Sequence, residues 1–315
     1  MKQKNVIDVP VSEIVEFWNE CIGNSFPMTQ KLWIQNTLQD SNVLKEASIV
    51  IYENGQLIGL VVAKRYQEKL QTEMSKYIGW IQCLLVRKIA RNRGIGQKLL
   101  NHVEKKFNNL HLREIRLGRD PWHYFPGVPL ENIETIKWFE RRGYKKESIE
   151  IDLRREVRTV EPYKLTNPTH LFRVLTREEI PKLLSFLKQV FPGRWHYEAL
   201  RYANINGSGR EFMGFFIDNE LKGFCRMNDP QSPLIAQNVY WSSLFKGPLG
   251  GIGPLGIDRH VRGNQYGIDL VKAASNELIL RGMHHIVIDW TQLVTFYEKL
   301  EYVPWKHYET MSKSI

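Results

Sequence analysis

One succession of elements occurs twice along this chain of 315 residues. A β-branched run at 49–52 leads through the turn 53–55 into an apolar run at 57–63, which is the pattern of a β-hairpin. The pattern recurs in the second half, where Leu57-x-Gly59 corresponds to Leu221-x-Gly223, 164 residues later. An internal repeat constrains the fold more than any other feature, because each half must then contain the same set of elements.

The two halves also share their later elements. Each has an apolar strand, a glycine-rich turn and a helix, followed by a strand, a short helix and a final strand. The strand at 80–86 matches 250–257, the turn at 91–96 matches 262–267, and the helix at 97–107 matches 268–280. The segment 138–144 near the end of the first half matches 296–302. The offset changes from 164 to 171 and then to 158 residues. This change predicts an irregular insertion at 228–238 and a longer loop at 119–129.

Helical spacing of apolar residues opens each half, at 11–21 and 30–38 and again at 178–190 and 195–202. Thr176 and Glu179 form the pattern of a capping box before the second pair. The order of elements predicts an α/β architecture in each half, with helices packed on the faces of a mixed sheet. We predict an N-terminal domain at 1–157, a linker at 158–170 and a C-terminal domain at 171–315.

Composition narrows the class of protein. Hydrophobic residues at 43% and charged residues at 25% are typical of globular chains and exclude a disordered one. No apolar run approaches the ~18–20 residues of a membrane span, and the first residues do not form a signal peptide. We therefore expect a cytoplasmic protein without a membrane partner. Cys21, Cys83 and Cys225 lie far apart, so free buried thiols are expected rather than disulfides or a metal site.

The net charge of +10 is spread over both halves and favours anionic ligands in general. The sequence has no helix-turn-helix pattern and no basic block, so nucleic acid is not expected as a partner. The charge by itself does not choose between phosphorylated cofactors and acidic metabolites. The oligomeric state stays open as well.

The turn Arg91-x-x-Gly94-x-Gly96 carries the most chemical information. A strand leads into it and a helix follows at once, so the unpaired amides of the first helical turn can hold a phosphate group. Glycines let the backbone approach such a group closely, and arginines add charged donors. An ordinary glycine-rich turn is the alternative. Leu99 stands where a dinucleotide-binding turn has its third glycine, and a Gly-Lys-Ser/Thr triphosphate loop is missing.

This turn resembles the acetyl-coenzyme A loop of the GCN5-related N-acetyltransferase (GNAT) family, and the order of elements in both halves is the family's order. The resemblance implies two tandem GNAT folds, each a mostly antiparallel mixed sheet flanked by helices, in an arrangement similar to that of mycothiol synthase. It implies acetyl-CoA as the acyl donor. The residues implied as coenzyme ligands are Leu85, Val86, Arg91, Asn92, Arg93, Gly94, Ile95, Gly96 and Asn132 in the first copy, and Ile257, Arg262, Gly263 and Gly267 in the second.

The two copies depart from the family at different positions. In the first copy Phe139 stands where many members have a tyrosine that protonates the departing thiolate. In the second copy Tyr297 matches that tyrosine, but Gln265 replaces the middle glycine, Trp290 the asparagine and Glu301 the last glycine. The resemblance therefore implies a better coenzyme site in the first copy and a better proton donor in the second.

Three residues are candidates for catalysis. Tyr297 is the candidate acid, and the alternative is that it only packs the last helix. Asp289 at a strand end is the candidate base, and the alternative is that it caps a helix starting near Thr291. His123 lies in the loop 119–129, which we expect to overhang the cleft as a substrate lid carrying a base, unless it packs on the sheet edge.

The expected function is that of an N-acetyltransferase, which moves the acetyl group of acetyl-CoA to a primary amine of a small molecule or peptide. The different losses in the two copies predict one catalytic and one degenerate domain. The alternative function is that of a non-catalytic acetyl-CoA binder that acts as a sensor or scaffold.

Overall fold

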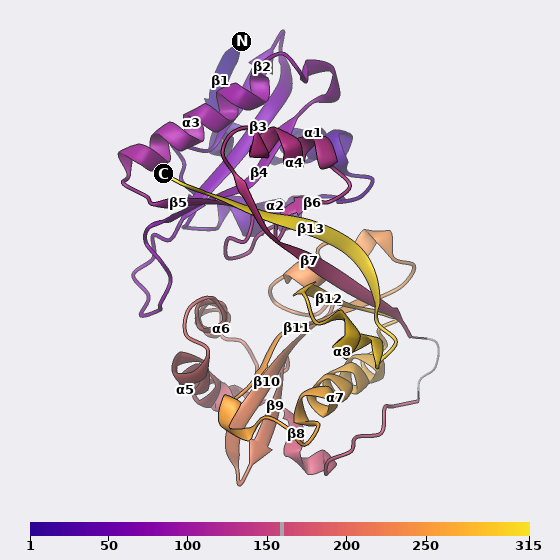
Figure 1. The fold of residues 1–315 in the computed structure, drawn as a ribbon. Coiled ribbons are helices and arrows are strands. Elements are labelled where there is room, and N and C mark those ends of the chain that lie inside the picture. The colour runs from indigo at the N-terminus through magenta and orange to yellow at the C-terminus, as the bar shows by residue number, and fades with distance from the viewer. Residues whose placement is uncertain (158–160) are drawn as a thin grey trace. The chain divides into compact units, whose positions relative to one another are not determined.

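The computed structural model describes residues 1–157 and 161–315. These residues form two compact units (Figure 1). The first unit comprises Met1–Lys69, Ser75–Glu150 and Lys306–Ile315, and the second comprises Leu70–Met74 and Ile151–Trp305. Within the described residues, no helix has both the length and the apolar character needed to cross a membrane.

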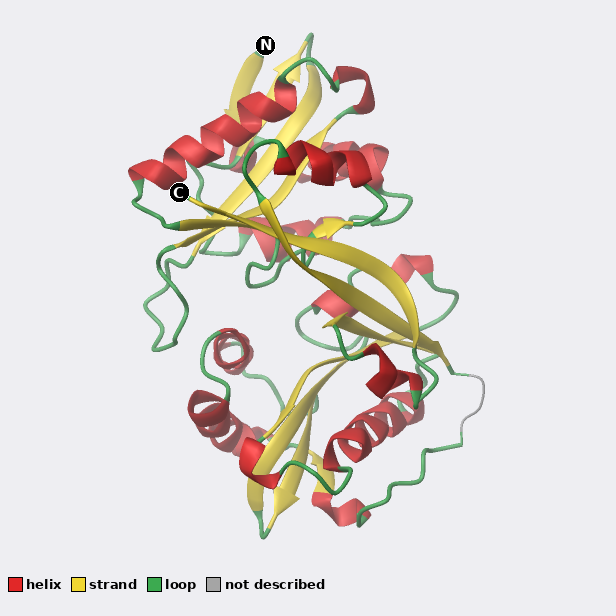
Figure 2. Cartoon of the chain, viewed as in Figure 1, coloured by secondary structure: helices red, strands yellow, loops and turns green. Residues whose placement is uncertain are grey.

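The first unit has a central sheet with helices on its faces (Figure 2). The sheet order is β1-β2-β3-β4-β5-β13. Its strands are β1 (Lys2–Asn5), β2 (Ile49–Glu53), β3 (Gln56–Arg65), β4 (Ile78–Val86), β5 (Glu114–Leu117) and the short β6 (Val128–Pro129), which pairs with β13. Its helices are α1 (Val11–Ile22), α2 (Gln30–Trp33) with the π-helical turn Ile34–Leu38, α3 (Ile95–Asn109) and α4 (Ile133–Glu140).

The second unit repeats this plan with the sheet order β7-β12-β11-β10-β9-β8. Its strands are β8 (Phe172–Val174), β9 (Phe212–Ile217), β10 (Glu220–Asn228), β11 (Leu249–Ile257) and β12 (His285–Thr291), and its helices are α5 (Ile180–Val190), α6 (Arg194–Asn204), α7 (Tyr266–Leu280) and α8 (Val294–Glu298). Two long strands, β7 (Lys145–Glu156) and β13 (Val303–Ser314), belong partly to each unit.

The predicted fold class is confirmed in both units. Within each unit, the described strand pairs are antiparallel except for β4–β5 and β11–β12, which are parallel. Asn54 and Gly55 have φ of 50° and 80°, as the hairpin turn between β2 and β3 requires. Asp218 and Asn219 take the same left-handed conformation in the second unit. The capping box of Thr176 and Glu179 also forms, at the short 3-10 turn that precedes α5.

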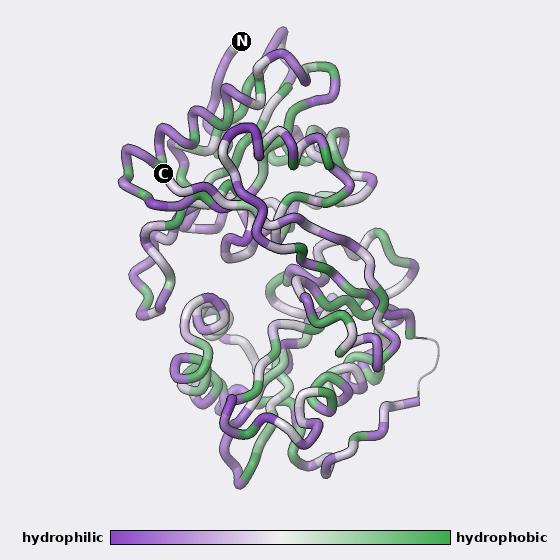
Figure 3. Tube along the Cα trace, in the orientation of Figure 1, coloured by the Kyte–Doolittle hydropathy of each residue, from purple (hydrophilic) through white to green (hydrophobic). Residues whose placement is uncertain are grey.

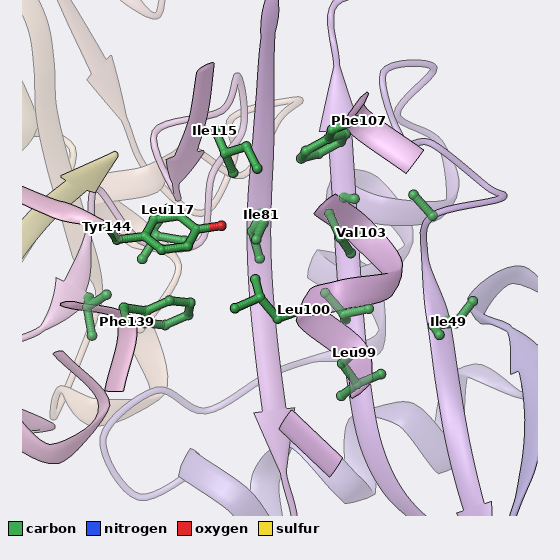
Figure 4. Packing of buried hydrophobic residues seen from close by; sticks show 14 of the residues in the cluster. Ile49, Ile81, Leu99, Leu100, Val103, Phe107, Ile115, Leu117, Phe139 and Tyr144 are labelled. Carbon is green, nitrogen blue, oxygen red and sulfur yellow. The ribbon is translucent and has the colours of Figure 1, made fainter. Parts of the chain in front are cut away.

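Helix α3 shows how the sequence pattern produces the packing. Leu99, Leu100, Val103 and Phe107 recur at helical spacing and are fully buried, while the residues between them are polar (Figure 3). These four side chains face the strands of the first unit, where they pack in one cluster with Ile81 (Figure 4). The packed helix fixes the turn at its N-terminus against the end of β4.

Two short strands were not predicted. β1 consists of Lys-Gln-Lys-Asn and β8 of three residues, and both lie at a sheet edge. The sequence of β1 lacks the apolar alternation that indicates a strand, and its side chains are exposed or half-buried. A polar edge strand of this kind also protects the sheet from pairing with other chains.

The last ten residues lie in the first unit, although the predicted domain boundary assigns them to the second. They form the end of β13, where Ser312 pairs with Arg116 and Lys313 with Ile115 of β5 (Figure 1). Met311 on the same strand is fully buried in the core of the first unit. The first unit is therefore completed by the C-terminus of the chain.

Part of the predicted linker is anchored on α7. Residues 158–160 lie outside the described residues. Beyond them, Thr166 and Asn167 donate their amides to the Asp269 carboxylate at 2.9 and 2.8 Å, and Tyr163 donates its amide to Asn276 at 2.7 Å. Burial by itself would raise the pKa of Asp269, but these amide hydrogen bonds hold it below its ordinary value.

Shortening Met311 should test whether the C-terminal strand stabilises the first unit. Met311→Ala leaves a cavity in a fully buried position and should lower the free energy of unfolding by ~2–5 kcal/mol. Urea denaturation measures the loss, and amide hydrogen exchange locates it in peptides of the first unit. The exposed Ser314 on the same strand provides the control Ser314→Ala. Equal stability of both variants would contradict the assignment.

Candidate active site

The turn between β4 and α3 has the geometry of an anion site. Gly94 has φ +79° and forms the N-cap of α3, and a Cβ there would meet no heavy atom within 4 Å. Among the described residues, no side chain caps this helix, so its first amides are available at the positive end of the helix dipole. Arg91 precedes the turn, and its Nε donates to the Val86 carbonyl at 3.1 Å. The turn can therefore hold a phosphate group.

β4 separates from β5 next to this turn. The β4–β5 pairing in the described chain runs from Ile78 to Ile81, although β4 itself continues to Val86. The pairing of β4 with β3 also shifts register, and Gln82 is the extra residue on β4. The edge of β4 beyond Gln82 therefore borders an opening instead of a neighbouring strand.

A cavity of about 740 Å³ occupies this opening. Its wall includes Leu85, Val86, Arg91, Asn92, Gly94, Ile95, Gly96 and Asn132, which the resemblance implies as coenzyme ligands. Arg93 is not part of the wall, because its guanidinium turns to Glu53 at 2.8 Å. The structure thus brings most of the first-copy candidates together around one space, and their role as ligands stays a prediction.

Sequence reasoning missed several side chains of this wall. Three of them follow Asn132 at helical spacing: Thr135 and Trp138 on α4, and Arg142 just beyond its end. A fourth, Gln97, lies in the first turn of α3. The spacing itself is a signal, because residues three or four apart share a helix face. The face that carries Asn132 could therefore have been extended to Arg142 from the sequence.

The wall contributed by α1 and the loop 119–129 is apolar. Ile22, Phe26 and Phe125 line the cavity there, and the rings of Phe26 and Phe125 meet edge to face at 4.9 Å. This wall offers no acid or base to a bound substrate. Among the described residues that line the cavity, the one acidic side chain is Glu134 on α4.

The loop 119–129 is packed inside the first unit and does not overhang the cleft as a lid. Residues 120–128 are buried, and the Tyr124 hydroxyl lies 2.9 Å from Thr37 Oγ1. Lys64 on β3 holds the loop in place, since its ammonium pairs with Asp120 of the loop at 2.7 Å and with Asp40 at 2.8 Å. Burial would lower the pKa of Lys64, but the two carboxylates raise it above its ordinary value, so the lysine stays charged.

His123 belongs to this buried loop. Its exposed fraction is 1%, and it does not line the cavity. Burial of the loop follows from its aromatic residues, which pack against α1 and α2: Tyr124 stacks on Trp33, and Phe125 stacks on Trp18. The structure therefore separates His123 from the other candidates, and its catalytic role remains a prediction.

The second unit repeats the turn with altered residues. Arg262 donates its Nε to the Ile257 carbonyl at 3.2 Å, which reproduces the contact of Arg91. Gln265 takes the left-handed conformation of Gly94, with φ +61°, at the N-cap of α7. The anchored segment contacts this turn, because Asn167 donates to the Asn264 carbonyl at 2.7 Å and Thr166 donates to the Gln265 side chain at 3.3 Å. The turn with Gly263 and Gly267 is thus partly covered by the chain itself.

Asp289 lies where β12 separates from β11. The β11–β12 pairing in the described chain ends at Ile252 and Ile288, as in the first unit. Asn238 from the insertion 228–238 donates to the Asp289 carboxylate at 3.0 Å. Burial raises the pKa of Asp289 to about 6, although Arg194 and the hydrogen bond from Asn238 oppose the shift. The helix-capping alternative is wrong, because α8 begins at Val294 with Leu293 as its N-cap.

Tyr297 on α8 is buried close to Asp289. Its hydroxyl has no hydrogen-bond partner among the described residues, and its ring meets Phe296 and Tyr302 edge to face. Burial raises the pKa of Tyr297 above its ordinary value, and the Asp289 carboxylate raises it further. The phenol therefore keeps its proton at physiological pH.

Comparison with known proteins decides the family. Residues 13–144, which apart from Leu70–Met74 lie in the first unit, match the acetyltransferase (GNAT) family. Residues 13–144 therefore form a GNAT-family domain. Members of this family use acetyl-CoA as the acyl donor, and the matched segment contains the turn, the opening beside β4 and the whole of α4. A comparison with curated proteins gives no match.

Several solved GNAT structures share the fold over the whole chain. A glucosamine N-acetyltransferase region of a fungal multi-domain GH3 β-N-acetylglucosaminidase matches 99% of this chain with a TM-score of 0.85 and 19% identity, and the match spans 38% of that protein. A GNAT from Sphaerobacter thermophilus matches 99% of this chain and 95% of its own, with a TM-score of 0.73 and 11% identity.

A tandem GNAT protein from the clavulanic acid biosynthesis pathway matches 99% of this chain and 98% of its own, with a TM-score of 0.67 and 12% identity. At sequence identities this low, the likeness to these structures supports the fold of the chain and not its substrate. The tandem GNAT arrangement is confirmed by these full-length matches.

Placing a negative charge in the first turn should prevent coenzyme binding to this GNAT protein. Gly94→Glu directs a carboxylate toward the expected pyrophosphate and should weaken acetyl-CoA binding about 100-fold or more, as measured by isothermal titration calorimetry. Gly94→Asn tolerates the left-handed backbone without the charge and controls for strain. Gln265→Glu places the same charge in the second turn and should leave the affinity unchanged. The reverse result would assign the coenzyme to the second unit.

Proposed function

We propose that this protein catalyses transfer of the acetyl group from acetyl-CoA to a primary amine of a small molecule or peptide. The observation that supports this most is the cavity of the first unit, which combines a phosphate-binding turn with an open strand edge. A pyrophosphate at the turn would place the pantetheine arm along β4, between Leu85 and Asn132. The thioester would then reach the place where β4 and β5 separate.

The chemistry of the transfer asks for three contributions. The thioester carbonyl has to be polarised, the ammonium of the acceptor has to lose a proton, and the departing thiolate gains from an acid. The amides of β4 beyond Ile81 are not engaged by β5 and suit the first task. Phe139 in the cavity wall offers no proton for the third.

Asp289 and Tyr297 of the second unit suit the two proton transfers. Asp289 has its pKa raised to about 6, so near neutral pH it is ionised and can still accept a proton from an ammonium. Tyr297 retains its proton and can supply it to a thiolate. The first unit therefore has the better coenzyme site and the second the better acid and base, so each unit lacks part of a complete site. Catalysis in the first unit would leave protonation of the thiolate to solvent, whereas Asp289 and Tyr297 would act on a thioester bound in the second unit. In either case one domain is catalytic and the other degenerate.

A second candidate is a sensor or scaffold that binds acetyl-CoA without turnover. Phe139 and Gln265 favour it, because each removes one element of a complete site from its own unit. Tight binding of acetyl-CoA together with the absence of any amine-dependent release of thiol would support this alternative.

An assay with a panel of amines tests the proposed activity. Thiol release from acetyl-CoA is followed with glucosamine, an alkylamine, lysine and a short peptide, since a protein of similar fold is known as a glucosamine N-acetyltransferase region. We expect turnover with at least one primary amine and loss of that turnover in Gly94→Glu. Tight coenzyme binding without turnover on any acceptor would overturn the enzyme proposal.

Replacing Asp289 should reveal the base. If Asp289 accepts the proton, it must be ionised, so kcat should rise with pH through about 6 and then level off. Asp289→Asn keeps the hydrogen bond from Asn238. If the second unit carries the reaction, this variant should lower kcat about 100-fold or more, with acetyl-CoA affinity retained. Asp258→Asn is the matched control, because Asp258 caps a short 3-10 turn through the His260 amide. An unchanged kcat and pH profile in Asp289→Asn would rule out this base.

A further inference from the structure

Arg142 is held in a fixed orientation at the wall of the cavity. It follows the end of α4, and its guanidinium lies over the Trp138 ring at 3.8 Å from the ring centre. Its Nη1 donates to the Trp138 carbonyl at 2.8 Å, and its Nε donates to Gln97 in the first turn of α3. Three contacts thus orient a planar charged group next to the phosphate-binding turn.

Arg142 has no carboxylate at ion-pair distance among the described residues, although Glu104 attracts its charge from farther away. Among the described residues Arg142 forms no ion pair, whereas the nearby Arg93 is paired with Glu53 at 2.8 Å. Arg91 is the second arginine of the wall, and it also lacks an ion pair within the described chain. Two arginines on separate elements therefore bring uncompensated charge to one cavity.

Acetyl-CoA carries anionic groups at two places, a diphosphate and a phosphate monoester on the ribose 3′-oxygen. The amides of the α3 N-terminus and Arg91 suit the diphosphate. Arg142 lies on a different element, and the Trp138 ring that it covers is also the ring that a Cβ at Gly96 would meet at 3.4 Å. Arg142 is therefore placed beside the turn, whereas Arg91 precedes the turn directly.

We propose that Arg142 binds the ribose 3′-phosphate of acetyl-CoA, with Trp138 and Gln97 as positioning residues. The inference rests on the proposed binding of acetyl-CoA in this cavity. With Nε and one Nη1 proton engaged, the guanidinium keeps three N–H donors, two of them on Nη2, and a guanidinium binds phosphate oxygens through such paired donors. The first unit then distinguishes coenzyme A from its 3′-dephospho form.

Two ligands and three variants test the proposal. Calorimetry gives the Kd of acetyl-CoA and of acetyl-3′-dephospho-CoA for the wild type, and we expect the 3′-phosphate to tighten binding about 10- to 100-fold. Arg142→Gln should weaken acetyl-CoA binding and bring the ratio of the two Kd values close to one. Arg91→Gln should weaken both ligands by a similar factor, because both carry the diphosphate.

Arg93→Gln is the control, since Arg93 lies in the same turn but outside the cavity wall, and its ratio should equal that of the wild type. An unchanged ratio in Arg142→Gln would overturn the assignment of Arg142, even with acetyl-CoA binding intact. A wild type that binds neither ligand would instead overturn the proposed function. The two failures are therefore distinguishable.

Discussion

The opening between β4 and β5 is the feature on which the rest of the first unit depends. One extra residue, Gln82, shifts the register of β4 against β3, and β4 leaves β5 at Ile81. A parallel pair that continued to Val86 would close the sheet and leave no space of about 740 Å³. The packed helix α3 then holds its N-terminal turn at the end of the freed strand edge. The residues at which β4 leaves β5 and the residues of the anion-binding turn are therefore close together in the sequence.

The second unit keeps the backbone of this arrangement while its side chains have changed. β11 and β12 separate after Ile252 and Ile288, and Arg262 makes the contact of Arg91. The turn, however, carries Gln265 and is contacted by Thr166 and Asn167. The polar groups of this unit lie instead at the strand ends, where Asn238 holds Asp289. The two units therefore share their backbone geometry and differ in the side chains of the turn.

Much of the fold could be predicted because its signals are local. Neighbouring residues alone indicate the hairpin turn at Asn54 and Gly55, the helical spacing of α3 and the glycines of the first turn. The internal repeat supports each of these predictions with a second, similar segment. The features that were missed depend on pairing across the chain. β1 has no apolar residue, and nothing near Met311 indicates that the C-terminal strand completes the first unit.

The same distinction holds for the site. The turn residues around Gly94 were predicted and line the cavity, while His123 was expected at the cleft and is buried. Its burial follows from the aromatic packing of its loop against α1 and α2 and from the pairing of Lys64 with Asp120, and both join residues far apart in the sequence. Helical spacing after Asn132 could have placed Arg142 near the turn, but its orientation comes from Gln97 on another helix. Long-range polar contacts, rather than secondary structure, limit such predictions.

A crystal structure of the protein soaked with acetyl-CoA tests the central claim most directly. We expect electron density for the coenzyme in the cavity of the first unit, with its diphosphate on the amides that follow Gly94 and its thioester beside Gln82. Density at the turn of Gln265 instead, with an empty first cavity, would contradict the account.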